Sequence, residues 1–114
     1  MSEWLALAIS AAVEAPVAAL IVYYARWQSR GALHVGLAAA VATAVTHPQL
    51  WEAALWAYPR YEYWPSLLAL EALVVLAEAL LIAWMAKLAL HRALVVSLAA
   101  NIASCAAGLL FFGR

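Results

Sequence analysis

Charged residues are scarce in this sequence. Asp, Glu, Lys and Arg make up 11% of the 114 residues, whereas a typical soluble domain carries about 25%. The six acidic and six basic residues also cancel, so the chain lacks the basic surplus that binding to nucleic-acid phosphates requires. Nucleic acid is therefore excluded as an expected partner.

Cysteine is almost absent as well. The chain has one, Cys105, which excludes an internal disulfide and any paired-cysteine metal or redox motif. We interpret Cys105 as a small packing residue, because a free cysteine behaves as a small hydrophobic side chain.

Apolar residues, by contrast, make up 70% of the chain, against roughly 45–50% in soluble domains. A chain of this length is expected to form one small domain. Small soluble domains bury the smallest share of their surface, so a free soluble domain could not hide this much apolar surface. The composition thus predicts an integral membrane protein whose first partner is the lipid bilayer.

Four apolar stretches are long enough to cross a membrane, which takes roughly 20 residues. They span about residues 4–24, 32–56, 66–86 and 93–112. The connection from Ala57 to Pro65 contains two prolines and should interrupt the helix. The other connections are short, so consecutive helices should run antiparallel. We expect an all-α fold: one transmembrane domain over residues 1–114, a polytopic antiparallel four-helix bundle.

Orientation follows from the basic residues of the short connections, which favour the cytoplasmic side. Connections 25–31 and 87–92 carry Arg26, Arg30, Lys87 and Arg92, whereas the opposite end carries Arg60 and Arg114. The sequence therefore predicts that the basic connections are cytoplasmic and that both termini lie outside.

An internal repeat is suggested by the second and fourth spans. Residues 32–44 and 93–105 are identical at seven of thirteen aligned positions, and an offset of 64 residues places Glu14 on Glu78 in the first and third spans. The alternative is chance identity in a chain rich in alanine and leucine. If the duplication is real, the bundle consists of two repeated helical hairpins in the same orientation.

Two glutamates, Glu14 and Glu78, fall near the middle of their predicted spans. Each would cost roughly 2.5–3.5 kcal/mol at the centre of an isolated membrane helix. Such residues face the bundle interior or a wet cavity and are paired there. Two central carboxylates would not both stay ionised without a cation or a basic partner between them. These two acids are the leading candidates for a functional pair.

Further polar residues lie in stripes that follow helical spacing. The second span carries Gly36, Ala40, Thr43 and His47, and the fourth carries Ser97, Asn101, Ser104 and Gly108. Thr43, Asn101 and Ser104 should lie near the two central acids, while Glu71 and His47 should lie nearer the outer side. Together these side chains predict a polar column running from the outside to the centre of the bundle.

Our functional hypothesis is that the chain is a small membrane protein that binds or transports a proton, a cation or a small cationic solute. Its candidate binding residues are Glu14, Glu78, Glu71, His47, Asn101, Thr43 and Ser104. The alternative is a non-catalytic accessory subunit of a larger membrane complex, in which the acids pair with a neighbour. The expected protein partners are accordingly further copies of the chain or other membrane subunits.

The polar residues also have a purely structural interpretation, as hydrogen-bonding groups that hold helices together. No cofactor is predicted. A metal ion and a haem both stay open, although no close ligand spacing on one helix argues for either. His34 and His91, beside the basic connections, are expected to be solvated or to contact headgroups. No nucleophile–base motif supports an enzyme.

Overall fold

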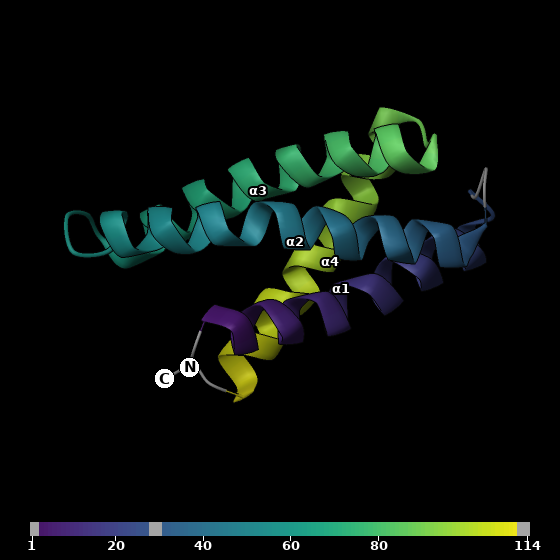
Figure 1. Ribbon diagram of the computed structural model, residues 1–114. Helices are drawn as coiled ribbons and strands as arrows, with labels where there is room; N and C mark the ends of the chain where they lie inside the picture. Colours follow the sequence, from purple (N-terminus) through teal and green to yellow (C-terminus); the bar gives the residue numbers. More distant parts are fainter. Residues whose placement is uncertain (1–2, 28–30, 112–114) are drawn as a thin grey trace.

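The computed structural model describes residues 3–27 and 31–111, and every regular element in them is an α-helix. The helices are α1 (Glu3–Ala25), α2 (Ala32–Ala57), α3 (Tyr63–Ala86) and α4 (Leu90–Phe111) (Figure 1). The all-helical prediction and its four helices are therefore confirmed. Residues 28–30, with Arg30, and Arg114 lie outside the described residues, as does the end of the predicted fourth span.

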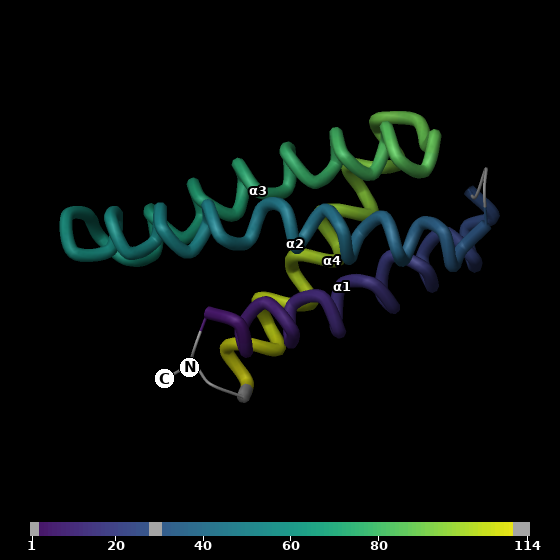
Figure 2. Tube along the Cα trace, viewed as in Figure 1, coloured from purple at the N-terminus to yellow at the C-terminus, as the bar shows by residue number. Residues whose placement is uncertain are grey.

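The helices form a closed ring in which each packs against two neighbours. α1 contacts α2 and α4, and α3 contacts α2 and α4. The end of α1 and the start of α2 lie at the same end of the molecule as the α3–α4 connection, and the α2–α3 connection lies at the other end (Figure 2). Consecutive helices thus run in opposite directions, so the middles of all four come together.

Local sequence explains where α3 begins and ends. It starts at Tyr63, three residues before the predicted span, because Pro65 falls in the first turn, where its missing N–H breaks no helical bond. It ends at Ala86, and the left-handed backbone of Lys87 (φ 54°) turns the N–H of Leu88 back to Ala83 O at 3.2 Å. Such a residue closes many helices. The next helix, α4, begins at Leu90, also three residues before the predicted span.

The interior is built from small side chains. Ala18, Ala42, Ala79 and Ala93 are fully buried, whereas most leucines of the same helices point outward. Large apolar side chains exposed on the surface include Leu20, Leu37, Leu73, Leu80, Leu98 and Leu110. Small residues at helix interfaces allow backbones to approach closely, and an apolar outer surface of this extent marks contact with a membrane or other proteins.

Three helices, α1, α3 and α4, are long and apolar enough to cross a membrane. α2 was predicted to be a span as well, but it does not reach the same hydropathy. Its stretch from Thr43 to Gln49 contains two threonines, a histidine, a proline and a glutamine, which lower the mean hydropathy of the helix. Several of these polar residues face the other helices, since Thr43 and His47 are both buried.

α1 and α2 are in close contact at Gly36. A Cβ atom at this position would lie 3.0 Å from Ala15 O and 3.2 Å from the Ala19 Cβ. Two residues before Gly36 in α2, His34 Nε2 donates to Met85 O at 3.0 Å, which joins α2 to α3. His34 is only partly buried, so the expectation that it is solvated or contacts headgroups stays a prediction.

Replacing Gly36 by alanine should destabilise the bundle. The added methyl group would push on the Ala15 backbone, and such overpacking costs about 1–3 kcal/mol. Gly108→Ala is the matched control, because nothing lies within 4 Å of a Cβ at that position. Thermal unfolding in detergent, followed by circular dichroism, should show a lower Tm for Gly36→Ala alone. Equal Tm values for the two variants would contradict the close packing of α1 on α2.

Candidate functional site

A small polar cavity lies between the four helices, close to the middle of each. Its volume is about 120 Å³. The residues that line it come from α1 (Ser10, Glu14), α2 (Thr43, Thr46, His47, Leu50), α3 (Glu71, Val74, Glu78) and α4 (Asn101, Ser104, Cys105). All seven candidate residues identified from the sequence are therefore gathered around one space.

Glu14 is buried, with 3% of its surface exposed. The hydroxyl group of Thr43, across the α1–α2 interface, donates to Glu14 Oε1 at 2.9 Å. The Thr43 hydroxyl oxygen also lies 3.0 Å from Ala39 O, one turn earlier in α2, so its single proton is shared between the two acceptors. The side chains of Ser104 and Glu78 lie beside the Glu14 carboxyl group. The first acid is thus held by α2 and faces the second.

Glu78 is equally buried, at 3% exposed, and receives two donors. Thr46 Oγ1 donates to its Oε2 at 2.7 Å, and Asn101 Nδ2 donates to its Oε1 at 2.9 Å. Carboxyl groups buried between helices need such partners, because burying a polar group without a hydrogen bond costs free energy. The second acid is therefore held from two sides, by α2 and by α4.

The amide of Asn101 is itself fixed by α4. Its Nδ2 also donates to Ser97 O at 2.8 Å, one turn earlier. Ser97 in turn donates from Oγ to Val75 O at 2.8 Å, which bridges α4 to α3. Asn101 thus holds one defined orientation, with its nitrogen directed at Glu78.

His47 lies toward the α2–α3 end of the cavity. Its ring stacks on Trp51, with centroids 6.0 Å apart. The residue is 8% exposed, yet its Nδ1 is buried with no hydrogen-bond partner. A buried ring nitrogen without a partner loses the hydrogen bond it would make in water. His47 therefore leaves one hydrogen-bonding position unused beside the acids.

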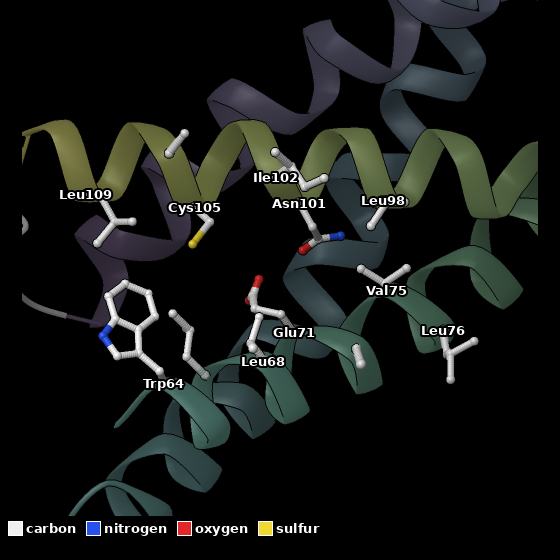
Figure 3. A pocket seen from close by; sticks show the side chains of 13 residues that line it. Trp64, Leu68, Glu71, Val75, Leu76, Leu98, Asn101, Ile102, Cys105 and Leu109 are labelled. Carbon is white, nitrogen blue, oxygen red and sulfur yellow. The ribbon is translucent and has the colours of Figure 1, made fainter. Parts of the chain in front are cut away.

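Glu71 lies two turns from Glu78 on α3, also toward the α2–α3 end, and is half-buried. It borders the polar cavity and also a second, larger groove between α3 and α4. Figure 3 shows its carboxyl group pointing across that groove toward α4, between Trp64 and Asn101. Of the three acids, it is the one closest to the molecular surface.

Sequence reasoning did not identify Thr46, which makes the shortest hydrogen bond to Glu78. Helical spacing could have found it, because Thr46 follows Thr43 by three residues, and residues three apart are neighbours on a helix. Ser10 and Cys105 also line the cavity. Cys105 was interpreted as a packing residue, but it borders both the cavity and the groove.

The described lining of the cavity contains acidic side chains but no strongly basic ones. Three glutamates line it, and no lysine or arginine among the described residues does. Across the part of the chain that the structure describes, no three His, Cys, Asp or Glu side chains meet in an arrangement that could hold a metal ion. The arrangement offers carboxyl oxygens and hydroxyl groups to something small and positively charged.

Comparison with known proteins gives no relative from which a role could be transferred. No family model matches the chain, and neither a curated protein nor a solved structure does. The function must therefore be inferred from the geometry of the cavity itself.

Proposed function

We propose that this chain is an integral membrane protein that binds and transports a proton or a small cation at Glu14 and Glu78. One observation carries the proposal: two buried carboxyl groups lie side by side in one cavity whose described lining includes no lysine or arginine. The acids of a membrane helix bundle generally mark ion or proton pathways.

Placement in a membrane is supported by the distribution of side-chain size. Three helices are long and apolar enough to span, the interior is alanine-rich, and the leucines face outward. A soluble protein gains stability from burying large apolar side chains, whereas membrane helices associate through close packing of small ones. In this proposal α2 is the fourth span, and its polar residues are shielded by the other three helices.

Aromatic residues around the α2–α3 connection support a membrane–water boundary at that end. Trp56 and Tyr61 have ring centroids 5.7 Å apart, and those of Tyr58 and Tyr63 are 5.0 Å apart. Arg60 lies over the Trp56 ring at 5.0 Å. Tyr and Trp concentrate at headgroup level in membrane proteins. This cluster would fix the depth of the bundle in the membrane, with the polar cavity near the bilayer centre.

Hydrogen bonding around the acids suits a small cation. Thr43, Thr46 and Asn101 each donate to one carboxyl oxygen, which holds the acids in place without neutralising them. Two adjacent carboxylates cannot both stay charged in a low-dielectric interior, so a shared proton or a bound cation must balance them. A cavity of about 120 Å³ has room for only a few particles the size of water, at about 30 Å³ each.

Cation binding should therefore release protons. Adding Na⁺ or K⁺ to the protein in well-buffered lipid nanodiscs should weaken the infrared band of protonated carboxyl groups. In a separate, weakly buffered sample the same addition should lower the pH of the medium. Glu14→Gln and Glu78→Gln should each weaken cation affinity by about tenfold or more, because losing one partner of a buried charge pair costs about 2–5 kcal/mol.

Glu52→Gln is the matched control for this measurement. Glu52 lies on the same helix as Thr43 and His47 but is exposed, so its removal should change neither the band nor the proton release. Cation-induced release that persists in both Glu14→Gln and Glu78→Gln would overturn the assignment of these acids. If neither the wild-type protein nor any variant responds to Na⁺ or K⁺, the small-cation role of Glu14 and Glu78 is refuted.

The proposed orientation has its own test. In a Cys105→Ser background, a membrane-impermeant maleimide added to intact cells should label Tyr61→Cys in the α2–α3 connection. It should label Ala89→Cys, in the exposed α3–α4 connection, only after the membrane is opened. The physical reason is the positive-inside preference of Arg26, Lys87 and Arg92. The reverse labelling pattern would invert the topology.

A further inference from the structure

A groove of about 740 Å³ runs between α3 and α4 on the outer surface of the bundle. Its walls are almost entirely apolar, and Leu68, Val75, Leu76, Leu98 and Ile102 form much of them (Figure 3). This size lies in the range of about 300–1,000 Å³ that small-molecule sites occupy. Glu71 is its single acidic lining residue, and no lysine or arginine in the described chain lines it.

The groove is continuous with the polar cavity. Glu71, Asn101 and Cys105 border both spaces, so these three residues form the boundary between the apolar outer surface and the buried acids. A ligand that lies in the groove can therefore place a polar end at the edge of the polar cavity while its apolar part stays in contact with the groove walls.

Two of the three boundary residues, Glu71 and Asn101, present acceptor oxygens to the groove. The nitrogen of Asn101 is committed to Glu78 and Ser97. Its oxygen is consequently turned toward the Glu71 carboxyl group, as Figure 3 shows. A carboxylate and an amide oxygen side by side fit a group that carries several N–H donors and a positive charge, and a primary ammonium has three such donors.

We propose that the groove binds a single-chain amphipathic primary amine, with its ammonium group between Glu71 and Asn101 Oδ1. This inference rests on the proposed function, because it names the class of cation that reaches the acid cavity from the side. The alkyl chain lies along Val75, Leu76 and Leu98, which follow Glu71 toward the middle of the bundle. In a bilayer this direction matches that of the lipid chains, with the charged end nearer the aromatic boundary.

Other amphiphiles fit the same groove less well. A fatty acid would bring a fourth carboxyl group beside Glu71, Glu14 and Glu78, where like charges repel. A phospholipid would place a phosphate in a groove whose described lining has no basic partner. A neutral alcohol of the same length could contact the apolar walls but would form no ion pair with Glu71.

Binding of radiolabelled dodecylamine to the protein in nanodiscs tests the proposal, with empty nanodiscs as the baseline for partitioning into lipid. Wild-type protein should bind saturably, and dodecanoate and dodecanol should compete weakly. Glu71→Gln should lower the affinity by about tenfold or more, because the charged partner is lost. Ala72→Phe should have a similar effect, since Ala72 lines the groove and the ring would fill it.

Ala77→Phe is the matched control. Ala77 is exposed on the same helix but lines the separate groove between α2 and α3, so amine binding should be unchanged while any general effect of an added ring is reproduced. Unchanged affinity in Glu71→Gln and Ala72→Phe, an absence of saturable binding, or equal competition by dodecanoate would each overturn the inference.

Cation-driven proton release, measured on the same nanodiscs, separates the two proposals. Release without amine binding would end the groove inference and leave the function at Glu14 and Glu78 standing. Saturable amine binding without any release by Na⁺ or K⁺ would leave the groove site standing and refute the small-cation role of the inner pair.

Discussion

Two carboxyl groups buried among apolar helices must be met by hydrogen-bond donors, and much of this bundle follows from that requirement. The donors are short side chains, the hydroxyl groups of Thr43 and Thr46 and the amide of Asn101. Short side chains reach across an interface only when the backbones are close. That closeness in turn requires alanine in the interior and glycine at position 36, where a Cβ would meet Ala15 O. The alanine-rich composition and the acid cavity are thus parts of one arrangement.

The same requirement explains the unusual character of α2. It supplies donors to both acids through Thr43 and Thr46, and these residues, with His47, lower its hydropathy below that of the other three helices. A polar helix of this kind would be costly in contact with lipid. Its cost is offset when the polar stripe faces neighbouring helices, as the burial of Thr43 and His47 shows. Hydropathy therefore reflects what a helix does inside the bundle as much as what surrounds it.

Seven of the residues that line the cavity could be predicted from the sequence because helical spacing fixes which side chains share a face. Glu14, Glu78, Thr43 and Asn101 lie near the middles of antiparallel helices, so they had to meet at one level once the helices packed. The individual pairings could not be predicted, because they depend on how far each helix is rotated and shifted along its neighbours. Spacing favours neither Thr43 nor Thr46 as the partner of Glu78, and only the packing of α2 between α1 and α3 assigns one threonine to each acid.

The predicted duplication stays a prediction, and the hydrogen bonds add a detail to it. Glu14 receives a donor from Thr43, whereas Glu78 receives one from Asn101, and Asn101 aligns with Ala40, which has no donor. If the two hairpins share an ancestor, their acids are now held by different groups.

Asn101 connects the two polar environments of the molecule. A side-chain amide offers its donors on one side and its acceptor on the other, so it cannot present both to the same neighbour. The need of Glu78 for a donor turns Nδ2 inward, where Ser97 O fixes it. The oxygen must then face the groove beside Glu71, as Figure 3 shows. A requirement of the buried acid therefore determines which chemistry the outer groove presents, and the chemistry at the surface follows from that at the centre.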